Sequence, residues 1–501
     1  MLQSVCVLAM AACAYGAAPE VTLRERASVR APGAEIVAPC ASDGSVLLTG
    51  HGVVRCVRLG EAGMTGVWRR SAREWVPAMG VDASVTHVAV DPLGRGFFVA
   101  LVAPARSWER TGRVVIAEMA TGEAISVHEV GYGPDACAFS RDGSTVIIAN
   151  EGEAGEPASG AVIDPPGTVS LLRIGDRGTV ETRALLPTRD GVEGELRVHP
   201  RNAEAVVLDL EPEYIAVMGA RAYITLQENN AVAEIDWRSG EVLRVFGLAP
   251  TLAVIDADDE DRAAGIHTTI VALPMPDQLA AFEEGERRYL VTANEGDERG
   301  GWGESALGDS ARVGDLRAAG RVAGHAHLGE RLKVCAFSGD ADGDGVIERV
   351  SLLGARSISV WDARTGALVS DTGTMLETAM SAHPAIYNAT GGAGGQADSR
   401  SDDRGPEPEG VTLGSVGGRR LAFVGLERPG AIAMIDLSEP ARPALLGLHP
   451  AAAHGRYAPE GLAFVDAADS PFGVPLLVVA YEASGEMVVY EVKISADDTG
   501  R

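Results

Sequence analysis

The chain has 501 residues, and its 43 Lys and Arg against 70 Asp and Glu give a formal net charge of −27. A field of this sign repels phosphate backbones and anionic headgroups, so nucleic acid is not an expected partner, whereas cations are. Hydrophobic residues at 46% and charged residues at 23% indicate a globular chain with a real core. Lys333 and Lys493 are its two lysines, and neither follows the glycine of a phosphate-binding loop, which excludes a P-loop nucleotide enzyme.

The first 18 residues, 1–18, are predicted to be a signal peptide. Their apolar run, residues 5–18, is too short to span a bilayer and ends in small residues suited to cleavage, although no basic residue precedes it. The alternative is a lipoprotein signal that ends before Cys13, which would then carry a lipid anchor. Either processing predicts a protein that is secreted or held in the periplasm or cell envelope, without a transmembrane segment in the mature chain.

Four cysteines follow this segment, and none has the CxxC spacing of a zinc ribbon or a thioredoxin-type redox motif. Cys40 and Cys56 would close a loop of roughly 17 residues as a disulfide in an oxidising compartment. Two buried small thiols are an equally good interpretation of the same pair. The sequence leaves this choice open.

From about residue 35 onward the chain repeats a β-rich unit, which predicts an all-β fold. Each clear copy starts with a proline and an acidic residue and continues through glycine turns and two further strands. These starts are Pro134-Asp135, Pro212-Glu213, Pro408-Glu409 and Pro459-Glu460. Such a meander cannot bury both of its faces alone, so we predict a single β-propeller over residues 30–495 with about seven blades. Six and eight blades are the alternatives.

Long inserted loops interrupt this repeat. Residues 252–281 carry a run of acids, residues 300–329 include a short helix expected near residues 310–319, and residues 390–405 are polar. Long loops on a rigid scaffold often carry functional sites.

The sharpest local motif is a candidate calcium loop. It places carboxylates at its first, third and fifth positions, Asp340, Asp342 and Asp344, followed by Gly345 and, at the ninth position, by Glu348. Such spacing can turn several hard oxygen ligands onto one calcium ion. The twelfth position is Ser351, where an EF-hand has Glu, so a β-hairpin calcium loop fits better than an EF-hand. A solvated Asp-Gly turn is the alternative.

The repeats also predict an acidic ring at one mouth of the propeller channel, because equivalent positions of the blades form a ring. Its candidate members at strand ends are Glu151, Glu228, Glu295, Glu427 and Glu482. Its candidate members at strand starts are Glu211, Glu213, Glu407, Glu409 and Glu460. Such acids would repel one another unless arginines or cations pair with them. A structural lattice of hydrogen bonds to the backbone is an equally good interpretation.

Ordered motifs over residues 130–492 resemble the choice-of-anchor I family, which includes the mesenchyme-specific cell surface glycoproteins. They include Asn150-Glu151-Gly152, Glu211-Pro212-Glu213-Tyr214, Asn294-Glu295-Gly296-Asp297, the Asp340 loop and Arg404-Gly405-Pro406-Glu407-Pro408-Glu409-Gly410. Residues 21–130 match only loosely. The resemblance implies an extracytoplasmic, propeller-like domain whose members carry assorted anchors and have mostly undefined activities.

Two functions are compatible with these features. The first is an exported, calcium-binding propeller that acts as a surface or envelope binding or adhesion module for an unidentified extracytoplasmic ligand. The acid excess favours it, as does the absence of the GxSxG, HExxH and GxGxxG motifs. The alternative is a calcium-dependent phosphohydrolase of phytase-like or phosphatase-like type, in which carboxylate-held metal ions bind phosphate and activate water. We expect the first, so an enzyme is the less favoured prediction.

Overall fold

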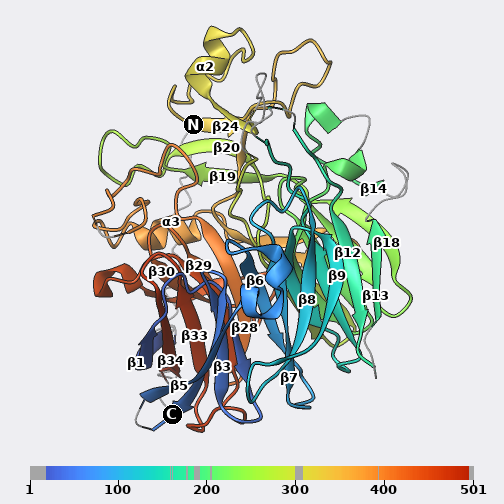
Figure 1. The fold of residues 1–501 in the computed structure, drawn as a ribbon. Helices are drawn as coiled ribbons and strands as arrows, with labels where there is room; N and C mark the ends of the chain where they lie inside the picture. The colour runs from blue at the N-terminus through green and yellow to red at the C-terminus, as the bar shows by residue number, and fades with distance from the viewer. Residues whose placement is uncertain are drawn as a thin grey trace, which may run out of the picture.

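The computed structural model describes residues 19–61, 63–157, 160, 162–175, 179–184, 192–202, 206–299, 308–392 and 394–495. Within these residues, seven sheets each contain four antiparallel strands in a meander (Figure 1). We number these sheets blades 1 to 7 in chain order. The signal peptide and the lipid anchor at Cys13 are predictions that lie outside the described residues.

The first four blades use consecutive strands. Blade 1 contains β2 (Val37–Cys40), β3 (Ser45–Gly50), β4 (Val53–Gly60) and β5 (Gly63–Ser71). Blade 2 contains β6 (Ser84–Val90), β7 (Phe97–Ala103), β8 (Thr111–Glu118) and β9 (Ala124–Tyr132). Blade 3 contains β10 (Pro134–Phe139), β11 (Thr145–Asn150), β12 (Thr168–Arg173) and β13 (Thr179–Ala184). Blade 4 contains β15 (Pro212–Met218), β16 (Arg221–Leu226), β17 (Ala231–Asp236) and β18 (Glu241–Gly247), with β14 (Val192–Glu193) added in parallel beside β18.

The last three blades complete the circle. Blade 5 contains β21 (Leu279–Glu284), β22 (Arg287–Ala293), β26 (Ile358–Asp362) and β27 (Leu368–Asp371). Blade 6 contains β28 (Pro408–Val416), β29 (Arg419–Leu426), β30 (Ala431–Asp436) and β31 (Ala444–His449). Blade 7 contains β32 (Pro459–Val465), β33 (Leu476–Tyr481), β34 (Glu486–Ile494) and β1 (Val21–Arg30).

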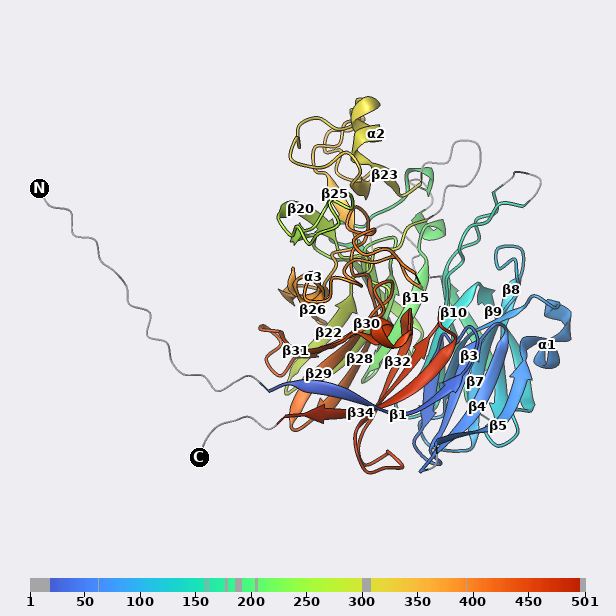
Figure 2. The same ribbon diagram turned by 90° about the vertical axis from the view of Figure 1, so that its left-hand side faces the viewer.

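The blades form a closed ring. Each innermost strand contacts the innermost strand of the next blade, and β32 of blade 7 contacts β2 of blade 1. Blade 7 joins the two ends of the described chain, because β1 pairs antiparallel with β34, with Val21 opposite Ile494 and Arg30 opposite Glu486 (Figure 2). Radial closure of this kind leaves only short, protected sheet edges. The structure is therefore a seven-bladed β-propeller, which confirms the predicted fold class.

The second strand of a blade shows why the sequence contains continuous apolar runs. Val146 and Ile148 of β11 pack into the core between blades 2 and 3. Ile147 and Ala149 of the same strand pack into the core between blades 3 and 4. A strand covered on both faces has no polar side, so it loses the alternation of apolar and polar residues that a half-exposed strand would show.

Two of the insertions meet in a small lobe at one end of the propeller (Figures 1 and 2). One precedes β21 and forms β19 (Thr251–Ile255) and β20 (Thr268–Leu273). The other separates β22 from β26 and forms β23 (Ser310–Arg312), α2 (Val313–Ala318), β24 (Lys333–Cys335) and β25 (Ser351–Leu353). Parallel pairing of β20 with β25 joins them, and a separate apolar cluster fills the lobe. The helix expected near residues 310–319 is confirmed by α2.

The remaining short helices connect the strands. They are α1 (Ala72–Trp75), α3 (Met375–Met380), η1 (Pro77–Met79), η3 (Pro200–Asn202), η4 (Val206–Leu208) and η5 (Ala451–His454). Within the described part of the chain, no helix is long and apolar enough to cross a membrane.

Cys40 and Cys56 are both buried as free thiols. Cys40 lies on β2 opposite Ser45, and Cys56 lies on β4 opposite Leu47, so β3 separates the two cysteines. Strands two positions apart are about 9–10 Å distant, beyond the reach of a disulfide. The structure therefore favours the interpretation as two buried thiols.

Candidate functional site

Acidic side chains from six of the seven blades meet in the central channel. They come from the starts of the innermost strands and are Glu35, Asp135, Glu213, Asp277, Glu409 and Glu460. Blade 2 supplies Thr86 and His87 instead. These residues line a cavity of ≈ 160 Å³ together with Glu151, Glu295, Asp297 and other residues. We call this cavity and its lining residues the acidic channel.

A repeated irregularity of the backbone positions these acids. In blades 3, 4, 6 and 7 the innermost strand begins with proline, and its pairing register shifts within the next three residues. Pro134, for example, lies opposite Asn150, whereas Cys137 lies opposite Ile148, so one residue of β10 is extra. Proline is tolerated at the first position of a strand, and a bulge redirects the side chains beside it. The Pro-acid motif thus places its carboxyl group at the channel.

The predicted acidic ring divides into two groups, and the Glu-Pro-Glu motifs show the division clearly. The first glutamate of each motif is paired with arginine: Arg299 Nε lies 2.6 Å from Glu211 Oε2. In the other motif, Arg400 Nε donates to Glu407 Oε1 at 2.6 Å, and Arg428 Nε donates to Glu407 Oε2 at 3.2 Å. These glutamates therefore hold loops in place rather than facing the channel.

The second glutamate of each motif lines the acidic channel without such a partner. Oε2 of Glu213 and Oε2 of Glu409 are buried and have no hydrogen-bond partner among the described residues. Glu213 as a whole is 7% exposed. Unpaired buried carboxylate oxygens carry a desolvation cost that only a partner or a proton can remove.

The glutamates predicted at strand ends differ from one another. Arg404 Nη1 lies 3.1 Å from Glu295 Oε1, and Gln227 Nε2 donates to Glu295 Oε2 at 3.1 Å. Glu427 pairs with Arg428 at 3.0 Å. Glu151 lines the acidic channel, and Glu228 is buried with its Oε2 atom unpartnered among the described residues, whereas Glu482 is exposed.

Burial raises the pKa of most of these carboxyl groups, and repulsion between neighbouring acids raises it further. The pKa rises to about 8 for Glu35 and Glu295, although Arg404 opposes the rise at Glu295. It rises to about 6 for Asp135 and to about 7 for Glu228 and Glu427. It lies well above the usual value for Glu151, Glu211, Glu213, Asp277, Glu409 and Glu460. The acidic channel is thus poised to take up protons or cations.

One triad in the acidic channel has the spacing of a metal site. Ligand oxygens of Asp277, Glu295 and Glu409 lie within 4.8 Å of one another. Glu295, Glu407 and Glu427 form a second triad with the same spacing. Arginines pair with all three members of the second triad, whereas Glu295 is the one member of the first triad with such a partner among the described residues, so the first triad is better suited to hold a cation. Calcium and magnesium both prefer oxygen ligands of this kind.

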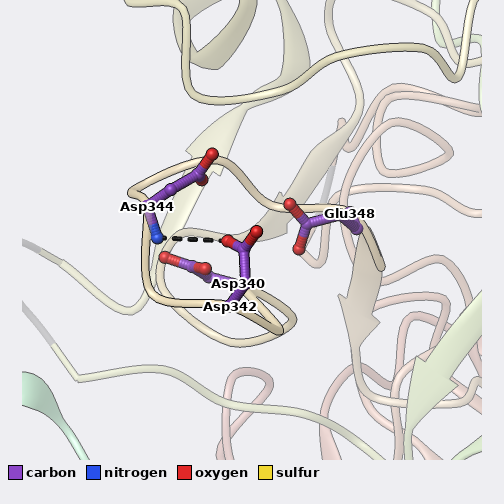
Figure 3. A group of neighbouring side chains, drawn as sticks. All are labelled: Asp340, Asp342, Asp344 and Glu348. Atoms are coloured by element: carbon purple, nitrogen blue, oxygen red, sulfur yellow. Dashed lines mark hydrogen bonds between the residues drawn. The ribbon is translucent and has the colours of Figure 1, made fainter.

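The Asp340 loop forms a separate acidic group on the inserted lobe. Ligand oxygens of Asp340, Asp342, Asp344 and Glu348 lie within 4.8 Å of one another, and Figure 3 shows these side chains gathered around the turn. Backbone N–H groups of Gly343 and Gly345 donate to the two oxygens of Asp340 at 2.7 and 2.9 Å. Residues 341–345 and Glu348 are exposed. This donor set fits calcium and also fits the alternative of a solvated turn.

Sequence reasoning placed Glu213, Glu409 and Glu460 at the channel mouth but missed Glu35, Asp135 and Asp277. Asp135 and Asp277 follow prolines, as Glu213 and Glu409 do, so the signal was present in the sequence. Glu35 follows alanine and carries no such signal.

Comparisons with known proteins give a family match and weak relatives. The model of the Choice-of-anchor I domain matches residues 45–440, which extends the resemblance to earlier blades. Gigasin-3a of Magallana gigas is 28% identical over 170 residues, covering 30% of this chain and 60% of that protein, so the match spans less than two thirds of this curated relative. Kuenenia stuttgartiensis hydrazine synthase aligns at a TM-score of 0.49 and 12% identity, over 94% of this chain and 97% of that chain. The Myceliophteria thermophila Cps50 (Swd1) β-propeller domain aligns at a TM-score of 0.45 and 10% identity, over 94% of this chain and 100% of that chain.

Proposed function

The chain belongs to the choice-of-anchor I family, and we propose that it works outside the cytoplasm as a calcium-dependent binding module. Choice-of-anchor domains are typically found on secreted or cell-surface proteins, which supports a surface-associated propeller.

The observation that carries the proposal is the pair of unpartnered oxygens in the acidic channel. Glu213 Oε2 and Glu409 Oε2 are buried among other acids and have no hydrogen-bond partner among the described residues. The nearby arginines pair instead with Glu211 and Glu407. A cation held by Asp277, Glu295 and Glu409 would offset this repulsion. An anionic group of a partner could then complete the coordination of that cation, which accounts for binding by a strongly acidic protein.

The Asp340 loop is a second candidate calcium site in this proposal. Its four carboxylates offer the hard oxygen ligands that calcium prefers, and its exposure leaves room for water or for a partner's oxygen as a further ligand. Magnesium should substitute poorly, because its smaller octahedral shell requires a more rigid arrangement of fewer protein ligands.

Metal analysis and thermal melts of the purified protein test the proposal. A cation that binds only the folded state adds about 2.7 kcal/mol of stability at a hundredfold excess over its Kd. We expect bound calcium after dialysis into chelator-free buffer and a higher melting temperature with calcium than with chelator. Equal melting temperatures together with no bound calcium would contradict the calcium-dependent part of the proposal.

Phosphoester hydrolysis is the second candidate. The observation that favours it is the position of Arg404, whose Nη1 lies 3.1 Å from Glu295 and 2.7 Å from Asp297 at the edge of the acidic channel. A guanidinium beside a carboxylate-held cation is an arrangement that can bind a phosphoryl group, while the cation activates water.

Release of phosphate separates the two candidates. The substrates are an aryl phosphate and phytate, each tested with calcium and with chelator. A binding module releases no phosphate above the buffer rate, whereas a phosphohydrolase turns over only with calcium and loses that turnover in Glu409→Gln.

A further inference from the structure

A second cavity, of ≈ 520 Å³, lies outside the acidic channel and shares no lining residue with it. Its walls come from residues 192–200 and Val206 beside blade 4, from residues 248–250 after β18, and from residues 337–340 at the start of the Asp340 loop. Figure 1 shows β14 and β18 at this edge of the molecule. Its volume falls in the range of sites that bind small organic molecules.

About half of the surface of this wall is apolar. Val192, Leu196 and Val206 are half-buried and pack on the core of blade 4, while Leu248 and Phe337 complete the apolar surface. An apolar wall of this kind favours the hydrocarbon part of a ligand, because its burial removes apolar surface from water.

Arg197 is the one cation among the residues that line this cavity, and it is only 5% exposed. Its Nη1 atom donates to the backbone oxygen of Glu228 at 2.7 Å and to Asp309 Oδ2 at 3.0 Å. Its Nε and Nη2 atoms have no acceptor among the described residues, and the guanidinium lies 4.3 Å from the centre of the Phe337 ring. Half of a buried guanidinium is therefore without hydrogen-bond acceptors.

We propose that this cavity binds an amphipathic carboxylate, with the carboxylate on Arg197 and the hydrocarbon chain on the apolar wall. Nε and Nη2 form one side of the guanidinium, and their two N–H groups point in parallel, which matches the two oxygens of a carboxylate. The apolar side chains then take the rest of the ligand. The site differs in chemistry and in position from the acidic channel.

Each acid around this cavity accepts a hydrogen bond on at least one of its oxygens. Asp309 pairs with Arg197 and accepts the Arg299 backbone N–H at 3.2 Å, and Glu195 pairs with Arg349 at 2.8 Å. Asp340 accepts two backbone N–H groups of its own loop. The free side of Arg197 therefore remains as the polar feature that a ligand can satisfy.

Isothermal titration of decanoate into the full chain tests this inference. The buffer contains chelator, so the outcome does not depend on the calcium proposal. We expect saturable binding of one decanoate per chain, weakened at least tenfold by Arg197→Gln. Decanol, which has the same chain without the charge, should bind wild type and R197Q within twofold of each other.

Two further variants keep the test decisive, because R197Q also removes the pairing with Asp309. Ser338→Trp fills the cavity without replacing Arg197 and should abolish binding of decanoate and decanol. Ser415→Trp, on the exposed end of β28, is the matched control and should bind both probes as wild type does. Absence of saturable decanoate binding to wild type, equal decanoate affinity in R197Q, or unchanged binding in S338W would overturn the inference.

Discussion

Glu407 and Glu409 are two residues apart in one Glu-Pro-Glu sequence, yet their surroundings are opposite. Glu407 accepts hydrogen bonds from Arg400 and Arg428 on its two oxygens. Glu409 lines the acidic channel, with one oxygen unpartnered among the described residues and a pKa raised by burial and by Glu460, Glu427 and Glu295. Replacing Glu407 by glutamine therefore removes a carboxylate that arginines pair with, whereas replacing Glu409 removes a carboxyl group that neighbouring acids repel.

We expect the two substitutions to change stability in opposite directions. In chelator at pH 7.5, Glu409→Gln should raise the free energy of unfolding, by on the order of 1 kcal/mol for each pKa unit of repulsion it relieves. Glu407→Gln should lower it by about 3–5 kcal/mol, because two guanidinium groups lose a buried partner. Urea unfolding of both variants measures the difference. A large loss of stability in both would mean that Glu409 is also a structural hydrogen-bonding residue.

The proposed calcium site in the Asp340 loop can be tested by counting the calcium ions that each chain binds. Asp342→Ala removes one of its four carboxylates and leaves the Asp340 hydrogen bonds to Gly343 and Gly345 in place. We expect the calcium stoichiometry from isothermal titration to fall by one per chain, with unchanged circular dichroism. Asp261→Ala, which removes a similar exposed carboxylate from another inserted loop, is the control and should keep the full stoichiometry. Full stoichiometry in both variants would identify the Asp340 loop as an ordinary turn.

The innermost strands could be predicted from sequence because proline, an acid and a bulge recur together at their starts. The same signal located Glu213 and Glu409 but did not distinguish them from Glu211 and Glu407. For Glu211 the distinction depends on an arginine that the fold brings in, since Arg299 is 88 residues beyond it in sequence, whereas Arg400 is 7 residues before Glu407. The local pattern thus indicates which residues approach the channel, whereas the folded structure decides which of these acids stay unpaired.

Strand β1 is the element that closes the ring, and its removal should affect the whole molecule. It pairs with β34 along nearly its entire length, and Val21 is 1% exposed in the core between blades 6 and 7. Deleting residues 19–30 would expose the edge of β34 and the apolar cluster behind it. We expect the deletion variant to lose a sharp cooperative thermal transition and to be cleaved faster by protease. A variant that melts as wild type does would show that the ring is stable without this closure.

At the scale of the whole molecule, the acidic channel couples stability to pH. The pKa of Glu35 and Glu295 is about 8 and that of Asp135 about 6 in the folded protein, against roughly 4 in the unfolded chain. An acid with a raised pKa binds its proton more tightly when folded. The free energy of unfolding therefore increases as pH falls through the folded-state pKa, and it decreases again as pH rises through that pKa.

The metal-free protein should accordingly melt at a higher temperature at pH 6 than at pH 8.5, by on the order of 5 °C. Ordinary surface carboxylates are ionised throughout this window, so they contribute little to the difference. Saturating calcium should reduce the difference, because a bound cation offsets the same repulsion that protons relieve. Glu460→Gln, which removes one channel charge, should reduce it as well, whereas Glu123→Gln on the exposed surface should leave it unchanged. A melting temperature that rises with pH across this window would mean that the acids of the channel are stabilised as anions by pairing, and the case for a cation there would fail with it.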